Sequence, residues 1–382
     1  MSPAPNAVRP DGLARPDVLL RRGRGEDIPA LVALENRCFD SDRLSRRSFH
    51  HMLTKAHGVL TVAEGQGGVL LGYAMVLFHA GTSLARLYSL AVDAGARGLG
   101  LGERLTRATE EQAVAEGCVA MRLEVRTDNA GAIALYERLG YHTFGVLPDY
   151  YEDHTAALRY EKRIAHAEGQ TQLPVPFHRQ NTDFTCGPAS LMMAMKALAD
   201  DVELNTRLEL TLWREATTIF MTSGHGGCGP LGLALAAWRR GFDAEVWRSE
   251  DGPLFVRTVR DPRKKEVIRM VHEDFKDQVA ATDIRVHHAP LTVRGLVEAV
   301  EGGGVPLVLI SQYRMNGEKG PHWVVVTGFD DHFIYFHDPD VDEDFHKTAI
   351  DCINVPIGRR EFDRMARFGR VGLRAAVVIR KR

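Results

Sequence analysis

Hydrophobic residues in the first part of the chain follow two alternating spacings. Short apolar or alternating stretches, typical of strands, are separated by stretches in which apolar residues recur every three or four positions, typical of helices. A glycine-rich turn at 65–68 joins two of the strands as a hairpin. We therefore predict an α/β domain over residues 18–164. Its predicted strands are 18–22, 58–64, 69–78, 85–92 and 120–125, its helices are 26–39, 100–116 and 130–139, and 142–162 forms a final hairpin-like region.

The pattern changes after residue 164. Residues 165–176 lose the periodicity and contain two prolines, so we predict a linker there. Beyond it, helical spacing comes first and strand-like runs follow, which predicts an α+β domain over residues 177–382 with antiparallel strands. The proline-containing, polar residues 1–17 predict a flexible tail. The predicted helices of the second domain include 187–199, 231–240, 262–280 and 291–301, and its strands are 306–312, 322–329, 332–337 and 373–380.

Composition supports two globular domains. The chain has 382 residues, of which 45% are hydrophobic and 26% charged, and this excludes a disordered, collagen-like or coiled-coil protein. The formal net charge is −2, with 20 basic and 20 acidic residues up to residue 163 and 28 and 30 beyond it. Neither domain has the field expected of a protein that binds nucleic acid or an anionic membrane. We expect small molecules or peptides as partners.

The five cysteines are widely spaced and include no Cys-x-x-Cys pair. An odd number of unclustered thiols argues against a disulfide framework or a zinc site, and it favours a reducing compartment. No apolar run suits a signal peptide or a membrane helix. We therefore expect a soluble, cytoplasmic protein. No structural metal is expected, since the alternating aspartates at 338–344 have Glu343 where a calcium loop needs glycine, and the histidine and cysteine pairs are too few for zinc.

A glycine-rich turn follows the predicted strand 85–92 and opens the predicted helix 100–116. Glycines let the backbone approach an anion closely, and the first-turn N–H groups and the helix dipole then stabilise its charge. The turn therefore predicts a pyrophosphate cradle. By itself it fits a plain strand-to-helix connection equally well. The residues of the predicted cradle are Arg97, Gly98, Leu99, Gly100, Leu101 and Gly102.

Two strings of sequence favour the cradle. The motif Arg97-x-x-Gly100-x-Gly102 and the string L-E-V-R-T-D-N-A-G-A-I-A-L-Y-E-R-L-G-Y at 123–141 closely resemble the GNAT acyltransferase superfamily, in particular its ribosomal-protein-alanine N-acetyltransferases. The resemblance covers about residues 18–164. It implies a mixed central sheet flanked by helices, acetyl-CoA as co-substrate and a peptide or protein amine as acceptor. Gly98 departs from the family, which often has a basic residue there.

Three side chains are candidates for the acetyl-transfer chemistry. An amine must lose a proton before it attacks a thioester, and Glu124, at the end of an interior strand, is the candidate base, acting directly or through a water. The resemblance implies that Tyr136 donates a proton to the leaving thiolate and that Asn129 contacts the pantetheine arm. The backbone N–H groups of Leu90, Ala91 and Val92 are candidate donors to the acetyl oxygen.

Structural alternatives exist for these residues. Tyr136 fits a core aromatic of an amphipathic helix, and Glu124 fits a salt-bridge partner of Arg122 or Arg126. Tyr150 and Tyr151 match an aromatic pair near the acceptor in the alanine acetyltransferases, and without that resemblance they would be surface-loop tyrosines.

A second group of candidate residues lies beyond the linker. Cys186 stands at the start of the predicted helix 187–199, where the helix N-terminus favours a thiolate nucleophile. Gln180, six residues earlier, can supply an amide N–H to an oxyanion hole. His322 begins a strand and Asp338 ends the next, so that two antiparallel neighbours can bring them together. Alternatively, Cys186 is an inert buried thiol and His322 a core histidine.

The order Gln, Cys, His, Asp and the strings Q-N-T-D-F-T-C-G-P-A and H-W-V-V-V-T-G-F resemble the bacteriocin-processing, double-glycine leader peptidases of the papain-like class. This resemblance covers about residues 173–382 and implies a papain-like cysteine peptidase fold. Cys228-Gly229-Pro230 repeats the C-G-P string, but Thr222 stands where a glutamine is expected, so we prefer Cys186 as nucleophile. Cys228 alternatively lines a cleft in the glycine-rich loop 223–229, a candidate flap.

These features predict a bifunctional enzyme: an acetyl-CoA-dependent N-acetyltransferase joined to a cysteine peptidase or amidohydrolase, both acting on peptides or proteins. Chains that look like this fusion are often encoded beside ATP-grasp peptide ligases, so the resemblance implies such a ligase as a candidate partner. Two alternatives stay open. The second domain could be a non-catalytic peptide-binding module, or the first could only sense acetyl-CoA.

Overall fold

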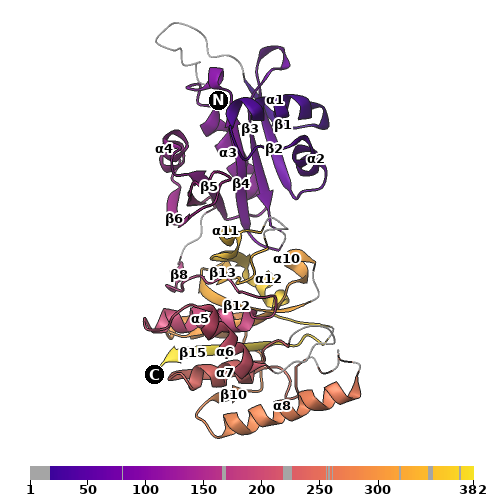
Figure 1. The fold of residues 1–382 in the computed structure, drawn as a ribbon, viewed down its shortest axis with the longest axis vertical. Helices are drawn as coiled ribbons and strands as arrows, with labels where there is room; N and C mark the ends of the chain where they lie inside the picture. The colour runs from indigo at the N-terminus through magenta and orange to yellow at the C-terminus, as the bar shows by residue number, and fades with distance from the viewer. Residues whose placement is uncertain are drawn as a thin grey trace. The chain divides into compact units, whose positions relative to one another are not determined.

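The computed structural model describes residues 18–79, 81–165, 169–217, 226–254, 256, 259, 261–317, 320–342, 347–369 and 371–382. The predicted tail at 1–17 and residues 223–225 of the predicted flap lie outside these ranges. Contacts group the chain into two units, residues 1–166 and 167–382. The predicted classes are confirmed: the first unit is α/β with a mixed sheet, and the second is α+β (Figure 1).

The first unit is built on one sheet with the strand order β1-β2-β3-β4-β5-β7-β6. All neighbouring strands are antiparallel except β4 and β5, which run parallel. The strands are β1 (Leu19–Arg22), β2 (Gly58–Glu64), β3 (Leu70–Phe78), β4 (Leu84–Val92), β5 (Ala120–Arg126), β6 (His142–Leu147) and β7 (Ala157–Arg163); the helices are α1 (Ile28–Cys38), α2 (Arg46–Thr54), α3 (Leu101–Ala115) and α4 (Ala130–Arg138).

Alternation along β3 explains how both faces of this sheet are covered. Tyr73 and Met75 belong to a buried cluster with residues of α1 and α2, whereas Ala74 and Val76 belong to a second cluster that includes Leu105 of α3. Successive strand residues point to opposite faces, so one strand serves two cores. The helices α1 and α2 lie on one side of the sheet and α3 on the other (Figure 1).

The helix α2 is absent from the sequence prediction. It buries only Phe49 and Met52, three residues apart, among basic and polar residues. Ser45 is the N-cap of the helix, because its hydroxyl accepts a hydrogen bond from the N–H of Ser48 at 3.1 Å. Two apolar positions are too few to make a periodic signal.

The second unit contains an eight-stranded sheet with the order β10-β9-β15-β11-β12-β13-β14, and β8 pairs with β12. Its strands are β8 (Thr171–Gln172), β9 (Phe242–Arg248), β10 (Arg285–His287), β11 (Val305–Ser311), β12 (Pro321–Phe329), β13 (Phe333–His337), β14 (Val355–Gly358) and β15 (Ala375–Lys381). Its helices are α5 (Cys186–Leu198), α6 (Thr206–Ala216), α7 (Pro230–Trp238), α8 (Pro262–Ala280), α9 (Val293–Glu301), α10 (Tyr313–Asn316), α11 (Ala349–Cys352) and α12 (Arg359–Met365).

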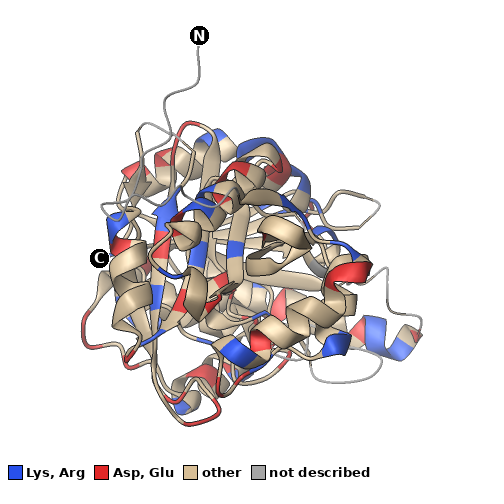
Figure 2. Ribbon diagram, turned by 90° about the horizontal axis from the view of Figure 1, so that it is seen from above, with Lys and Arg blue, Asp and Glu red and all other residues tan. Residues whose placement is uncertain are grey.

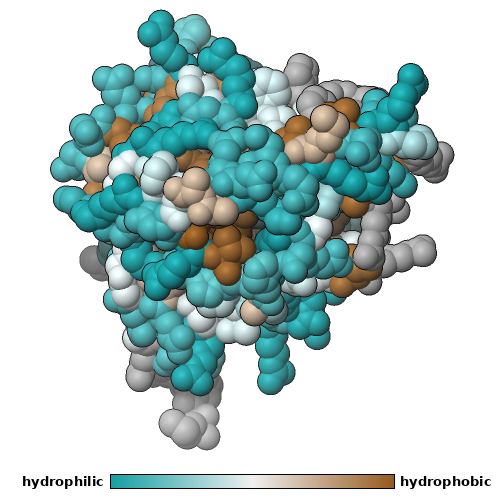
Figure 3. Space-filling view, turned by 90° about the horizontal axis from the view of Figure 1, so that it is seen from below, coloured by the Kyte–Doolittle hydropathy of each residue, from teal (hydrophilic) through white to brown (hydrophobic). Residues whose placement is uncertain are grey.

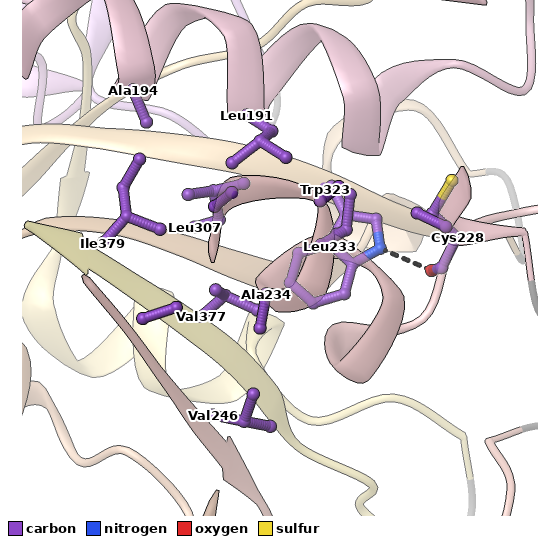
Figure 4. Close-up of a cluster of buried hydrophobic side chains, with 14 of the residues drawn as sticks. Leu191, Ala194, Cys228, Leu233, Ala234, Val246, Leu307, Trp323, Val377 and Ile379 are labelled. Atoms are coloured by element: carbon purple, nitrogen blue, oxygen red, sulfur yellow. Dashed lines mark hydrogen bonds between the residues drawn. The ribbon is translucent and has the colours of Figure 1, made fainter. Parts of the chain in front are cut away.

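The larger core of the second unit lies between this sheet and the helices α5 and α7. Leu191 and Ala194 of α5 and Leu233 and Ala234 of α7 meet residues of β9, β11, β12 and β15 (Figure 4). The other face, with Val308 of β11, packs against residues of α9 and α12. Near-continuous apolar strands are expected where both faces are buried.

One part of the predicted order is wrong. The strand β9 lies between the helices α7 and α8 in sequence, although only helices were expected there. It pairs antiparallel with the last strand, β15, and parallel with β10. The sheet of the second unit is therefore mixed. Because β10 lies about 40 residues and β15 about 130 residues further along the chain, the local sequence of β9 gives no sign of this pairing.

The surface agrees with the balanced charge of the sequence. Basic and acidic residues are interspersed along the ribbons (Figure 2). The face drawn in Figure 3 is mainly hydrophilic, with small separated hydrophobic areas.

Candidate active sites

The glycine turn before α3 has the geometry of an anion cradle. Gly98 and Gly100 have φ angles of 79° and 74°, in the left-handed region that favours glycine. The backbone N–H of Arg104 bonds to the carbonyl of Gly100 at 3.1 Å, so the N–H groups of the three preceding residues lie outside the helical ladder. Gly100 has no heavy atom within 4 Å of the Cβ it lacks, which leaves room beside these donors. The cradle residues thus suit the pyrophosphate of acetyl-CoA.

The pairing of β4 with β5 ends well before the glycine turn. They pair in register only from Leu84 with Ala120 to Arg86 with Arg122, although β4 continues to Val92 and stays paired with β3. A register irregularity in the pairing of β3 with β4 lies beside Leu87. The predicted oxyanion donors Leu90, Ala91 and Val92 lie in this diverging stretch, where backbone groups on the β5 side can meet a ligand.

Glu124 of β5 is fixed by a buried arginine. Its Oε2 accepts from Nε of Arg86 at 3.1 Å and lies 3.0 Å from Nη2 of the same guanidinium. The side chains of Arg86 and Glu124 are only 5% and 6% exposed. Nη2 of Arg86 also donates to the hydroxyl of Tyr150 at 3.0 Å. Arg86 therefore links the candidate base to the predicted aromatic pair.

Arg86 is a site residue that the sequence reasoning missed, because the structural alternatives offered Arg122 or Arg126 to Glu124. Arg122 pairs with Glu161, and Arg126 pairs with Asp128 and Asp153. One signal was available. Arg86 is the only charged residue of the mainly apolar strand β4, and a buried strand carries a charge only where a partner meets it.

Tyr136 and Asn129 have structural roles in α4. Tyr136 is buried, with its ring centroid 5.6 Å from that of Tyr141 and 6.4 Å from that of Tyr160. Burial raises the pKa of Tyr136, so the phenol stays protonated at neutral pH, as a proton donor must. Asn129 begins α4, since its Oδ1 accepts from the N–H of Ala132 at 3.1 Å. The core position of Tyr136 and a chemical role are thus compatible.

The aromatic pair Tyr150 and Tyr151 is half-buried. The two rings meet edge to face at 5.1 Å, and the guanidinium of Arg126 lies 5.0 Å from the Tyr151 ring. Burial raises the pKa of Tyr150 to about 12. The pair therefore packs beside Arg86 and Glu124 instead of projecting from a loop.

The second unit brings Cys186, His322 and Asp338 together. Cys186 is the first residue of α5, His322 lies on β12, and Asp338 follows β13 directly. The Nε2 atom of His322 lies 2.6 Å from Oδ1 of Asp338, with both side chains at most 4% exposed. Cys186 is half-buried and interacts with the same imidazole. Since Nε2 faces the carboxylate, Nδ1 is left for the thiol, as in a cysteine-histidine-aspartate triad.

The electrostatics of this group favour a charged histidine. Burial opposes the imidazolium, but the carboxylate of Asp338 and the sulfur of Cys186 outweigh it and raise the pKa of His322 to about 10. Burial likewise opposes the charge of Asp338, yet Lys347 and His322 hold the pKa of that carboxyl well below its usual range. An imidazolium beside a thiol stabilises the thiolate, which is the nucleophilic form.

Gln180 lies against the loop that carries the triad carboxylate. Its backbone N–H donates to the carbonyl of Pro339 at 2.9 Å, and its Nε2 donates to Oδ1 of Asp340 at 3.2 Å. The second oxygen of Asp340 accepts from Nε2 of Gln312 at 3.3 Å. One hydrogen of the Gln180 amide is thus held by Asp340, and the other is available to an oxyanion.

The second cysteine, Cys228, is placed differently. It is 4% exposed, its Sγ lies 4.0 Å from the carbonyl of Trp213, and its own carbonyl accepts from the Trp323 indole at 3.0 Å (Figure 4). Burial raises the pKa of the Cys228 thiol well above its usual value. A Cβ on Gly187 would lie 3.2 Å from the Cβ of Cys228, so this thiol packs behind the start of α5. The deep burial of Cys228 and the half-buried position of Cys186 favour Cys186 as the nucleophile.

Glu209 of α6 is a further residue that sequence reasoning missed. It is fully buried and holds the segment before Cys186: its Oε1 accepts from the N–H of Asn181 at 2.8 Å, and its Oε2 binds the Asn181 side chain and lies 3.0 Å from Nε2 of His178. Although burial opposes its charge, these bonds and one from Thr185 keep the pKa of Glu209 below its usual value. No local pattern marks Glu209, because its partners lie about 30 residues earlier.

Each of the two units matches the model of a known protein family. A model described as the Peptidase_C39 like family matches residues 175–380, and one described as the acetyltransferase (GNAT) family matches residues 28–141. None of the helices in the described parts of the chain is long and apolar enough to cross a bilayer.

The curated relatives include several N-acetyltransferases. An uncharacterized N-acetyltransferase of Methanocaldococcus jannaschii is 37% identical over 155 residues, which are 40% of this chain and 96% of that protein. A putative [ribosomal protein bS18]-alanine N-acetyltransferase of Bacillus subtilis is 29% identical over 134 residues, 35% of this chain and 87% of that protein. Four other relatives, three of them mycothiol acetyltransferases, are matched over only 25–34% of their own length.

Among solved structures, the ribosomal-protein-S18-alanine N-acetyltransferase from Escherichia coli is similar, with 25% identity and a TM-score of 0.36, over 40% of this chain and 96% of that protein.

The contacts of Glu209 predict a measurable loss of stability. Replacement of Glu209 with Ala leaves the buried donors of Asn181 and the His178 ring without their acceptor, so the free energy of unfolding should fall by about 3 kcal/mol. Urea unfolding of the full chain, followed by circular dichroism, measures the change.

Glu215, on the same helix, provides the control. It pairs with Arg240 and is 28% exposed, so Glu215→Ala should cost less than about 1 kcal/mol. Equal losses in the two variants would contradict the role given to Glu209.

Proposed function

Because the chain belongs to the Peptidase_C39-like family and carries a GNAT acetyltransferase domain, we propose that it is a bifunctional enzyme that acetylates the amine of a peptide or protein and cleaves an amide bond of a peptide substrate. The observation that carries the hydrolase half is the contact of His322 with Asp338 beside the half-buried Cys186. The acetyl-transfer half rests on the cradle before α3 and on the fixed carboxylate of Glu124. An acceptor of the ribosomal-protein type is favoured by the relatives.

The first unit has the groups that acetyl transfer needs. Acetyl-CoA, when bound, supplies the acetyl group as a thioester. The free N–H groups at the start of α3 hold the pyrophosphate, and backbone N–H groups of Leu90–Val92 orient the acetyl oxygen. Glu124 takes the proton of the acceptor amine, and Arg86 holds that carboxylate in place. Tyr136 provides a proton to the departing sulfur.

The second unit has the groups that amide hydrolysis needs. Sγ of Cys186 attacks the carbonyl carbon, and the amide of Gln180 with the backbone N–H of Cys186 stabilises the oxyanion. The imidazolium of His322 then gives its Nδ1 proton to the leaving amine. In the second half, the neutral ring takes a proton from water, which attacks the thioester and releases Cys186. Asp338 keeps Nε2 of the ring fixed through both steps.

Thiol reactivity gives the first prediction. The pKa values of Cys38, Cys118, Cys228 and Cys352 are all raised by burial, whereas Cys186 meets an imidazolium whose pKa is about 10. Because His322 keeps its charge up to about pH 10, Cys186 should react with iodoacetamide well below pH 8.5, and the four other thiols should hardly react. Peptide mapping by mass spectrometry after timed alkylation compares all five in one sample.

Cleavage tests the hydrolase directly. The full chain is incubated with acetyl-CoA and a peptide pool from a cell extract, and mass spectrometry scores new termini and new acetyl groups separately. Cys186→Ala should reduce cleavage by about 10⁴-fold or more and leave acetylation unchanged. Cleavage that survives in Cys186→Ala but stops in Cys228→Ala would move the nucleophile to Cys228. New acetyl groups without new termini would instead favour a peptide-binding module.

Acetyl transfer depends on two side chains of the first unit. Glu124→Gln and Tyr136→Phe should each lower kcat by about 10²-fold or more, since each loses one proton-transfer group. Glu161→Gln and Tyr141→Phe are matched controls, because Glu161 also pairs with a buried arginine and Tyr141 packs against Tyr136. Acetylation rates on peptides that the wild type modifies provide the measurement. Equal rates in Glu124→Gln and Glu161→Gln would exclude Glu124 as the base.

A further inference from the structure

The triad carboxylate has a second cation on its other oxygen. Nζ of Lys347 lies 2.7 Å from Oδ2 of Asp338, whereas His322 lies 2.6 Å from Oδ1. The Lys347 side chain is only 17% exposed. Each oxygen of one buried carboxylate thus faces its own cation, and the carboxylate cannot rotate without losing both contacts.

Lys347 also faces the carboxylate that holds the predicted oxyanion amide. Its Nζ lies 3.6 Å from Oδ2 of Asp340, whose Oδ1 accepts from Nε2 of Gln180 at 3.2 Å. A carboxylate accepts hydrogen bonds and repels a carbonyl oxygen, so Asp340 selects the NH2 end of the Gln180 amide. The backbone N–H of Asp340 bonds to Oδ1 of Asp338 at 3.0 Å, which joins the two carboxylates in one loop.

The position of Lys347 is itself fixed by backbone contacts. Its N–H donates to the carbonyl of Asp342 at 2.8 Å, and its carbonyl accepts from the N–H of Asp342 at 2.9 Å. This pair of bonds holds Lys347 beside Asp342, where its ammonium faces Asp338. The thiol of Cys352 donates to the carbonyl of Asp340 at 3.3 Å and closes the other side of the loop.

We propose that Lys347 is a positioning residue of the hydrolase site: it holds Asp338 toward His322 and, through Asp340, the amide of Gln180 toward the oxyanion. The proposal rests on the hydrolase function proposed above. Lys347 touches no reacting atom, and it acts through the residues that it holds and through its charge.

The charge of Lys347 gives its role a measurable effect on the reactivity of Cys186. The active form has a thiolate and an imidazolium beside the two carboxylates, and Lys347 offsets one of these negative charges. Loss of the ammonium leaves excess negative charge beside Cys186, so we expect alkylation of this thiol to need a higher pH. The described titratable groups that face this cluster are Asp338 and Asp340 after β13, His322 of β12, Cys186 of α5, and Asp351 and Cys352 of α11.

The test is the pH dependence of Cys186 alkylation in the full chain. Rates with iodoacetamide are measured between pH 4 and pH 10 for the wild type, Lys347→Met, Lys347→Gln and Lys347→Arg. We expect the midpoint to rise by about one pH unit in the Met and Gln variants. The Arg variant keeps the charge and should restore most of the shift.

Two controls separate this role from a structural one. Lys276→Met removes an exposed lysine of α8 that pairs with Glu273, and it should leave the midpoint unchanged. Lys347→Gln retains a hydrogen-bond donor for Oδ2 of Asp338, so it keeps the proposal testable if the Met variant does not fold. Thermal melting identifies the variants that fold.

The outcomes distinguish the two proposals. A wild-type midpoint below pH 8.5 that is unchanged in Lys347→Gln and Lys347→Met would overturn the role of Lys347 and leave the hydrolase function standing. A wild-type Cys186 that does not react below pH 8.5 would count against the hydrolase function itself.

Discussion

Both units depend on carboxylates that are buried and held by cations. An isolated carboxylate is costly to remove from water, and the cost is offset only by an opposite charge and by hydrogen bonds to both oxygens. In the second unit, His322 and Lys347 meet Asp338, which has no exposed surface. In the first unit, Arg86 meets Glu124. Arg86 and Glu124 lie on the paired strands β4 and β5, and His322 and Asp338 lie on or directly after the paired strands β12 and β13, so the sites can form only when the sheets have formed.

The need to fix distant groups also explains why the segment from Gln180 to Cys186 makes so many hydrogen bonds to side chains. Residues before α5 have no strand or helix to fix them, and Gln180 and Cys186 must still be placed to within a fraction of an ångström. Glu209 holds this segment from α6 on one side, and Asp340 holds Gln180 from the loop after β13 on the other. The buried carboxylate of Glu209 and the half-buried one of Asp340 thus supply the order that regular structure supplies elsewhere.

The sequence predicts much of the framework, because strands, helices and glycine turns leave local patterns. The strand β4, the helix α3 and the turn between them follow from spacing, and the strings around Cys186 and His322 identify the second site by resemblance. The strand β9 and the helix α2 escape prediction, since one depends on distant pairing and the other buries only two side chains. Arg86 escapes for the same reason as β9, because it meets Glu124 from a strand that lies 38 residues earlier. Lys347 lies only nine residues after Asp338, outside the named helices and strands, so no periodic spacing marks it.

A common chemistry follows from this arrangement in both units. Acetyl transfer needs a carboxylate that can accept a proton from an amine, and amide hydrolysis needs an imidazolium that can give a proton to one. A cation at the carboxylate fixes its direction in both units. In the first unit, Arg86 meets one oxygen of Glu124 through two of its nitrogens. In the second unit, His322 and Lys347 take one oxygen each of Asp338. The cations that offset the cost of burying these carboxylates therefore also hold them in the orientation that each proposed reaction needs.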